Sequence, residues 1–348
     1  MKCVRINNVK EMQIDNIEIP TSKNGEVVLK VNSCGICGSD IHYWMSGTPK
    51  GLIMGHEFAG EVVDPGSRTD LKIGDRVTGL PISPCDNCDA CQTGNFQYCK
   101  ETWTHAVGLS LDNPGGYAEY TSCRADMIRK IPDNVTDDEA SMTEPAAVAL
   151  HAINLADIKV GNKVLIVGGG IIGLMSAEFA KLNGASYIAM LETNEERGKK
   201  AVKYQKTDEY YDAKDDTSIT KLQEKTQGGF DIVIECCGNS NAVSEAIMCT
   251  KPGGTVVLVG VSLSEITIPT VVAVMSEIKL QGAIAYTKKE FETCLDLISK
   301  KIINVSKYID ARLPLEKTQE SFERLTSGTD DAIKIILKPN YDNEIDLI

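Results

Sequence analysis

The feature of this sequence that most constrains its fold is a cluster of four cysteines with the spacing C-x2-C-x2-C-x7-C. The four are Cys85, Cys88, Cys91 and Cys99. Four thiolates this close in sequence can surround one tetrahedral ion, and zinc is the usual ion of an all-sulfur site. Because four protein ligands leave no position for a substrate, the pattern predicts a structural zinc.

An iron–sulfur cluster is the alternative, since ferredoxin-type runs also begin C-x2-C-x2-C. Those runs continue with three residues and a Cys-Pro pair, whereas here the last gap is seven residues and no proline follows. The spacing therefore favours zinc. The remaining cysteines are scattered, and we interpret several as small buried hydrophobic residues in a protein of the reducing cytoplasm.

Length and charge exclude several classes of protein. With 348 residues the chain exceeds one ordinary core, so we expect two domains. The net charge of −13 provides no basic stripe for a phosphate backbone, which argues against a nucleic-acid partner. No apolar run is long enough for a membrane span, and no signal-peptide pattern opens the chain, so we expect no membrane partner.

The pattern of the chain changes near residue 140. The first 135 residues read as short strands separated by turn signals, which predicts a compact β-barrel-like unit. An Ala-rich helix is predicted over 139–157, and six strands alternating with helices follow, the last over 279–285. This alternation predicts an open parallel sheet, and we expect the short C-terminal part to return to the first unit.

A glycine-rich turn follows the first of these strands. Gly168, Gly170 and Gly173 form G-x-G-x-x-G between a strand and a helix, and Glu192 ends the next strand. In this context the first glycine allows the tight turn, the second lets a pyrophosphate approach the backbone, and the third lets helix and strand pack closely. The helix N-terminus attracts the phosphates. A dinucleotide site is therefore predicted.

Glu192 also predicts which dinucleotide binds. A carboxylate there accepts hydrogen bonds from the adenosine ribose and repels a 2′-phosphate, and no arginine follows at once. NAD is therefore favoured over NADP. Arg197 either lies over the adenine or is a solvated charge on its helix.

A second set of residues with metal-ligand chemistry lies outside the four-cysteine cluster. A catalytic zinc takes three ligands from Cys, His and carboxylate and keeps one position open. Cys37 and His56, together with either Glu144 or Glu57, would supply them. Asp40 is three residues past Cys37, and its carboxylate could orient the ring of His56 without binding the metal itself.

The order of these motifs resembles the zinc-containing medium-chain dehydrogenase/reductase superfamily over essentially the whole chain. The matching runs are Cys37-Gly38-Ser39-Asp40, Gly55-His56-Glu57, the four-cysteine lobe, Thr143-Glu144-Pro145 and the glycine turn. The resemblance implies an α/β protein that combines a GroES-like β-barrel catalytic domain with a Rossmann doubly wound parallel sheet. It implies a catalytic domain over 1–150 with its zinc lobe at about 84–100, an NAD-binding domain over 151–287, and a C-terminal return over 288–348.

Within this superfamily the chain most resembles the polyol dehydrogenases, by His42-Tyr43-Trp44 and by a glutamate at 144. The resemblance makes Cys37, His56 and Glu144 the zinc ligands and Glu57 a ligand that exchanges during turnover. The positions that it implies for cofactor contact are Ile172, Glu192, Arg197, the 259–261 loop with Val259 and Val261, and the 283–285 segment with Ala283 and Ala285. Ala285 stands where sorbitol dehydrogenases tend to have a substrate-contacting arginine, so galactitol-phosphate-type and secondary-alcohol substrates stay open.

These parts predict a hydride transfer between a polyol or secondary alcohol, or a sugar-alcohol phosphate, and NAD, assisted by zinc. Ser39 and His42 would pass the released proton to solvent, although they also read as a turn residue and a surface ring. Tyr43 either lines the substrate pocket or packs in the core. Threonine- or butanediol-type activity and a catalytically silent NAD and zinc sensor are the alternatives. By resemblance we expect a homodimer or homotetramer.

Overall fold

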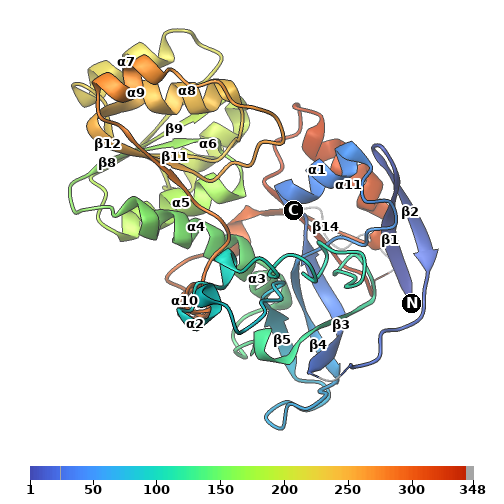
Figure 1. Ribbon diagram of the computed structural model, residues 1–348. Helices are drawn as coiled ribbons and strands as arrows, with labels where there is room; N and C mark the ends of the chain where they lie inside the picture. The colour runs from blue at the N-terminus through green and yellow to red at the C-terminus, as the bar shows by residue number, and fades with distance from the viewer. Residues whose placement is uncertain (24, 342–348) are drawn as a thin grey trace. The chain divides into compact units, whose positions relative to one another are not determined.

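The computed structural model describes residues 1–23 and 25–341, and the chain forms two compact units (Figure 1). One unit comprises Met1–Ala147 together with the chain from Thr287 onward, and the other comprises Val148–Tyr286. Among the described residues, no helix combines the length and the apolar character needed to cross a bilayer.

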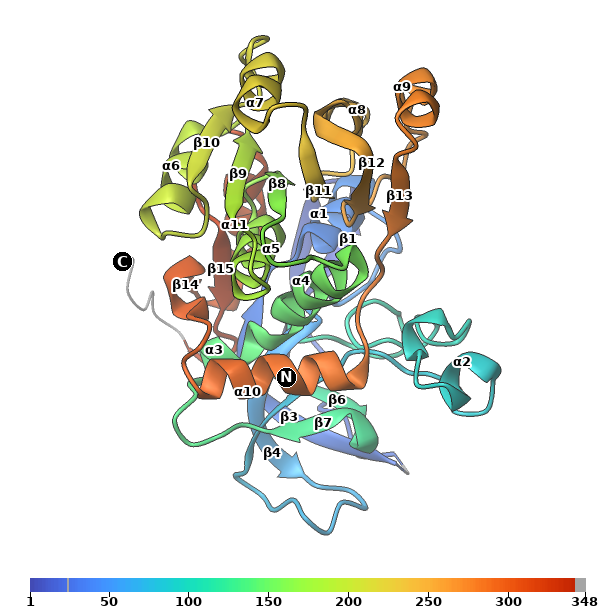
Figure 2. The ribbon, with the colours of Figure 1, turned by 90° about the vertical axis from the view of Figure 1, so that its left-hand side faces the viewer.

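The unit over Val148–Tyr286 is built on a six-stranded sheet whose strands are all parallel. The strands are β8 (Lys163–Val167), β9 (Tyr187–Glu192), β10 (Glu209–Asp212), β11 (Phe230–Glu235), β12 (Thr250–Leu258) and β13 (Lys279–Gly282). Figure 2 shows their order, β10-β9-β8-β11-β12-β13. Counted from the first strand this is the 3-2-1-4-5-6 order of a dinucleotide-binding sheet, so the predicted doubly wound sheet is confirmed.

The sequence of this unit explains its layers. Strands such as β8, Lys-Val-Leu-Ile-Val, are apolar on both faces because helices cover both sides of a parallel sheet. Its helices are α5 (Ile171–Leu182), α6 (Glu195–Lys203), α7 (Ser218–Thr226), α8 (Ser240–Cys249) and α9 (Thr270–Met275). Leu165, Val233 and Val256 from three strands are buried against Leu222 of α7 and Ala246 of α8.

The other unit contains a seven-stranded sheet of mostly antiparallel strands. Its order is β14-β15-β3-β4-β5-β7, and β6 pairs with β3. The bounds are β3 (Glu26–Gly35), β4 (Glu57–Asp64), β5 (Arg76–Gly79), β6 (Tyr120–Arg124), β7 (Ile128–Lys130), β14 (Ile309–Leu313) and β15 (Lys334–Leu337). β1 (Lys2–Asn8) and β2 (Glu11–Asn16) form a separate antiparallel hairpin, which precedes β3 in the chain. The C-terminal strand β15 thus joins a sheet that begins with residues near the N-terminus.

This unit also contains helices. They are α1 (Gly38–Ser46), α2 (Asp89–Gln92), α3 (Asp137–Ser141), α4 (Thr143–Ala156, which continues into the other unit), α10 (Lys288–Ser299) and α11 (Thr318–Thr326). The helix predicted over 139–157 is therefore two helices separated at Met142. The last predicted parallel strand ends at Gly282 rather than at residue 285, and Ala285 has a left-handed φ of 50°.

Candidate zinc and dinucleotide sites

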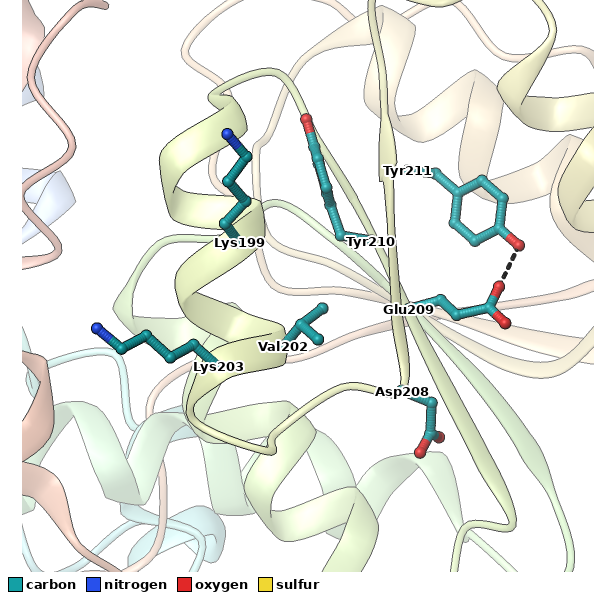
Figure 3. Close-up of a pocket in the computed structure, with 7 residues that line it drawn as sticks. All are labelled: Lys199, Val202, Lys203, Asp208, Glu209, Tyr210 and Tyr211. Carbon is teal, nitrogen blue, oxygen red and sulfur yellow. Dashed lines mark hydrogen bonds between the residues drawn. The ribbon is translucent and has the colours of Figure 1, made fainter.

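A pocket of 630 Å³ lies against the edge strand β10 and helix α6 (Figure 3). Its lining residues are Lys199, Val202, Lys203, Asp208, Glu209, Tyr210 and Tyr211. No residue in this lining is among those predicted for metal or cofactor binding. Lys199 is paired with Glu195 and Glu196 of its own helix, so its charge is already neutralised. The candidate site therefore consists of the residues predicted for metal and cofactor binding, not of this pocket.

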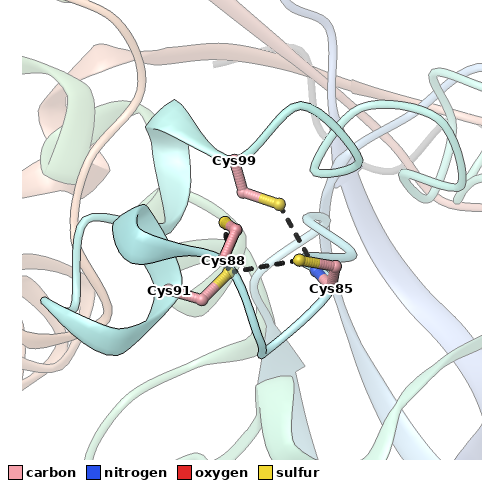
Figure 4. Close-up of side chains that lie close together, drawn as sticks. All are labelled: Cys85, Cys88, Cys91 and Cys99. Atoms are coloured by element: carbon pink, nitrogen blue, oxygen red, sulfur yellow. Dashed lines mark hydrogen bonds between the residues drawn. The ribbon is translucent and has the colours of Figure 1, made fainter.

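The four cysteines of the predicted structural site converge on one point, as Figure 4 shows. Their sulfur atoms all lie within 4.8 Å of one another. The Cys88 and Cys91 Sγ atoms are 3.6 Å apart, and those of Cys85 and Cys91 are 4.0 Å apart. Zinc–sulfur bonds of tetrahedral geometry place sulfurs about 3.8 Å apart. None of the four forms a disulfide, so the donor set fits a closed zinc site.

The pKa values of two thiols in this lobe are shifted in opposite directions. Burial, with the neighbouring Cys88, raises the pKa of the Cys91 thiol to about 12. Burial also opposes ionisation of Cys99, but the backbone N–H of Cys85 and that of Glu101 lower its pKa to about 6. One thiol therefore ionises readily and another resists ionisation. A divalent ion at their centre would stabilise the thiolates together.

Cys37, His56 and Glu57 form a second cluster, with one ligand atom of each within 4.8 Å of the others. Cys37 immediately precedes α1, His56 immediately precedes β4, and Glu57 is the first residue of β4. His56 and Glu57 are buried while Cys37 is half-buried. The three donors are a thiol, an imidazole and a carboxylate, which is a ligand set of catalytic zinc, so they fit that ion.

Asp40 links two of these residues. Its Oδ2 accepts a hydrogen bond from the Cys37 backbone N–H at 3.0 Å and one from the Tyr117 hydroxyl at 2.7 Å. Its Oδ1 lies 3.5 Å from Nδ1 of His56, and Asp40 is fully buried. The predicted role of Asp40 behind the His56 ring is consistent with this geometry. The contact between Tyr117 and Asp40 could not be predicted from the sequence, because the two residues are 77 positions apart.

The same neighbours control the charge of His56. Burial lowers its pKa, but interactions with Asp40 and with the Cys37 side chain raise it well above the ordinary value. The raised pKa favours the protonated imidazole in the metal-free chain. A metal ion binding at this ring must displace that proton.

The Glu57 carboxylate has a counter-charge that sequence reasoning missed. Nζ of Lys334 in β15 lies 2.6 Å and 2.8 Å from the two carboxylate oxygens, and both side chains are fully buried. Burial lowers the pKa of Lys334, but Glu57 and Cys37 outweigh it and raise that pKa. The one signal in the sequence is a lysine inside the apolar run Ala332-Ile-Lys-Ile-Ile-Leu337.

Glu144 lies in the first turn of α4 and is buried. It does not belong to the cluster of ligand atoms around Cys37, although its charge contributes to raising the pKa of Lys334. Ser39, His42 and Tyr43 are half-buried in α1 at positions i, i+3 and i+4, which lie on one face of a helix.

The glycine turn has the geometry that a dinucleotide requires. Gly168 has φ of +102°, and a Cβ on Gly173 would lie 1.9 Å from the Gly168 carbonyl oxygen. A Cβ on Gly170 would meet nothing within 4 Å, so this backbone faces open space. The buried Glu192 carboxylate accepts hydrogen bonds from the backbone N–H groups of Gly169 and Asn194.

The other predicted cofactor residues follow the carboxyl ends of the parallel strands. Ile172 is in the first turn of α5, and Arg197 is in α6, where its backbone N–H donates to Asn194. Val259 and Val261 follow β12, and Ala283 and Ala285 follow β13. Ligands of doubly wound sheets bind at these carboxyl ends.

Two family models match the chain. The model of the alcohol dehydrogenase GroES-like domain matches residues 23–133, and the model of the zinc-binding dehydrogenase matches residues 172–300.

Individual proteins resemble the chain along nearly its whole length. It is 32% identical to sorbitol dehydrogenase of Bombyx mori, covering 95% of this chain and 97% of that one. It is 32% identical to sorbitol dehydrogenase of Bos taurus, with 96% and 95% covered. The crystal structure of 2R,3R-butanediol dehydrogenase from Bacillus subtilis matches with a TM-score of 0.86 at 30% identity, covering 97% of this chain and 99% of that one.

Proposed function

The chain belongs to the zinc-dependent medium-chain dehydrogenase/reductase family, and on that premise we propose that it oxidises a polyol or related secondary alcohol with NAD. The GroES-like and Rossmann-type fold expected from the sequence is confirmed, as is the polyol-type relationship. The observation that carries the proposal is the convergence of Cys37, His56 and Glu57 in a chain that also has a dinucleotide turn.

We assign the catalytic zinc to Cys37, His56 and Glu144, with Glu57 as the exchanging ligand. The thiol of Cys37 and the imidazole of His56, which lie in one cluster, support two of these ligands. Glu144 lies outside that cluster, and we assign it as the resting carboxylate because Glu57 is engaged by Lys334. When bound, zinc would supply Lewis-acid polarisation of the substrate hydroxyl. We assign the structural zinc to Cys85, Cys88, Cys91 and Cys99.

The chain's own residues then have separate tasks. The hydroxyl of Ser39 would accept the proton released from the substrate, and His42, one turn further along α1, would pass it to solvent. Tyr43 would line the substrate pocket. Gly168, Gly170 and Gly173 would hold the cofactor pyrophosphate at the N-terminus of α5, and Glu192 would orient the adenosine ribose.

Ile172, Arg197, Val259, Val261, Ala283 and Ala285 complete the proposed cofactor contacts. We propose that residues 1–150 and 288–348 form the catalytic domain and 151–287 the NAD-binding domain; 342–348 lie outside the described residues. The twelve free cysteines support a location in the cytoplasm.

We also propose that the protein is a homo-oligomer. Strand β13 is the edge of its sheet, and all four of its residues are exposed. Val271, Val274 and Met275 of α9 add exposed apolar side chains. An exposed strand edge, together with exposed apolar side chains on a helix, is a surface that a second copy can cover.

The test is a substrate panel with NAD, followed by NADH absorbance. Sugar alcohols, their phosphates, vicinal diols and threonine are compared, and the proposal predicts the highest kcat/KM for a sugar alcohol or its phosphate. Preference for a vicinal diol would instead support the second candidate, a butanediol-type activity, which the structural similarity to 2R,3R-butanediol dehydrogenase favours.

The sensor alternative makes a different prediction in the same assay. A silent NAD and zinc sensor would bind both cofactors and form no NADH with any alcohol. The Cys37, His56 and Glu57 donor set is that of a catalytic zinc, which favours the enzyme over the sensor.

A further inference from the structure

Lys334 is an unusual residue for its surroundings, since lysines are rarely buried completely. Its Nζ donates hydrogen bonds to both carboxylate oxygens of Glu57 and to the carbonyl oxygen of Ile36, at 2.8 Å. The three donors of the ammonium group are thereby satisfied. Ile36 directly precedes Cys37, so the lysine lies beside the proposed catalytic metal centre.

Glu57 lies in a space that the backbone leaves for it. In the sheet register Glu57 of β4 stands opposite Gly35 of β3. A Cβ on residue 35 would lie 2.0 Å from Oε2 of Glu57, so only glycine leaves room for the carboxylate. Lys334 enters from β15, which is hydrogen-bonded to β3. Three strands thus build one receptacle for this carboxylate.

We propose that Lys334 is a positioning residue that holds Glu57 in this receptacle and so keeps the fourth position of the metal open. The proposal rests on the proposed function. A Glu57 ligand atom already lies within 4.8 Å of the donor atoms of Cys37 and His56, so a small movement would bring the carboxylate to the ion. Lys334 competes with the ion for the same carboxylate.

The physical reason is the cost of a buried charge. A buried carboxylate is tolerated only when it is paired. If Lys334 is replaced by a neutral side chain, the nearest remaining cation is the metal, and Glu57 would move onto it. The open position would then be occupied by protein rather than by substrate. Lys334, from the C-terminal part of the chain, therefore positions a carboxylate of the metal centre that N-terminal residues form.

The experiment uses cobalt-loaded, cofactor-free protein and imidazole as an external ligand, followed by the visible absorption of Co²⁺. A closed four-cysteine site offers no position to imidazole, so the response reports the Cys37 centre alone. Lys334→Met is expected to weaken imidazole binding by about tenfold, the size of effect typical for residues behind metal ligands. Glu57→Gln/Lys334→Met, which removes the competing carboxylate, is expected to restore wild-type affinity.

Gly35→Ala provides an independent route. It keeps the charge of Lys334 but fills the receptacle, so it too is expected to weaken imidazole binding, and it keeps the proposal testable if Lys334→Met does not fold. Unchanged imidazole affinity in the folded Lys334→Met protein, or in Gly35→Ala, would overturn the role of Lys334. No imidazole response in wild-type protein would instead overturn the metal centre itself.

Discussion

At the scale of single residues, Asp40 connects the proposed zinc ligands to the groups around them. Asp40 binds the backbone of one proposed zinc ligand, Cys37, and faces the ring of another, His56. The Tyr117 hydroxyl fixes the same carboxylate, and the Tyr117 ring packs edge-on against Phe322. Residues outside the proposed ligand set therefore hold two of the proposed metal ligands in place.

The first prediction concerns this chain of contacts. Asp40→Asn should weaken zinc binding at the Cys37 centre by about tenfold or more, because the ring of His56 loses its charged partner. Tyr117→Phe, which removes one oxygen, should have a smaller effect in the same direction. Competition with a chelator measures both. Tyr98→Phe, at an exposed side chain, is the control, and a Tyr117→Phe protein indistinguishable from it would contradict the role of the hydroxyl.

The second prediction concerns pH. The pKa of His56 is raised in the folded metal-free chain, so its proton stabilises that chain fully below the unfolded value of about 6.5, and this stabilisation is lost as pH rises through the raised pKa. Zinc must displace the proton. Below the raised pKa, zinc affinity should therefore fall at least about tenfold per pH unit.

Chelator competition across a pH series measures this dependence, and zinc held by the lobe is identified in a Cys37→Ser protein. Zinc affinity of the Cys37 centre that does not change with pH would show that His56 carries no proton to displace.

Sequence reasoning found some of these residues and could not find others. Cys37 and His56 were predicted because thiol and imidazole are ligands of zinc wherever they converge. Lys334 and Glu57 are 277 residues apart, and nothing local to either indicates the other. Pairing of that kind is decided by sheet register, which a single sequence does not determine.

At the scale of elements, the β8–α5–β9 unit is the clearest link between sequence and site. The spacing of Gly168, Gly170 and Gly173 predicted both the turn and the open space over Gly170. Glu192 ends β9 and turns toward this loop, where Gly169 donates to it. Its carboxylate is buried at the point where we propose that the adenosine ribose of the cofactor binds.

The third prediction follows from this charge. Glu192→Ser should raise KM for NAD by about tenfold and should reduce the preference for NAD over NADP, because the hydrogen-bond acceptor and the repulsive charge both disappear. Initial rates with the two cofactors measure the effect. Glu209→Ser on the neighbouring strand is the control, and an unaltered ratio of the two kcat/KM values in Glu192→Ser would contradict the assignment.

Element boundaries were predicted less well than element types. The alanine-rich pattern suggested one helix over 139–157, yet α3 ends at Ser141 and α4 begins at Thr143. Pro145 explains the break, since it has no N–H to donate to the Ser141 carbonyl of a continuous helix. The break matters because it places Glu144 in the first turn of a new helix.

At the scale of the whole molecule, the fold class was predictable because the pattern of apolar residues along the chain indicates it. Buried apolar strands alternating with helices indicate a parallel sheet, and its strand order follows from the rules for such sheets. The antiparallel sheet was not predictable in this way, because several of its strands pair with partners that are distant in the sequence. Strand β15 reaches β3 only at the end of the chain.

The fourth prediction concerns assembly. The wild-type protein should sediment as a dimer or larger oligomer at micromolar concentration, because one copy exposes an edge strand and the apolar side chains of α9. Met275→Glu should shift it toward the monomer, since a charge would be buried at the interface. Val160→Glu, at a side chain equally open to solvent, should not. A monomeric wild-type protein would contradict the proposal.

The most direct test of the central claim is the zinc content of purified Cys37→Ser beside that of the wild-type protein. With both sites as proposed, the wild-type chain holds two zinc ions, and the variant holds one, kept by the four-cysteine lobe, and forms no NADH. A variant that retains both ions and full activity would show that Cys37 does not bind the zinc on which the alcohol oxidation depends.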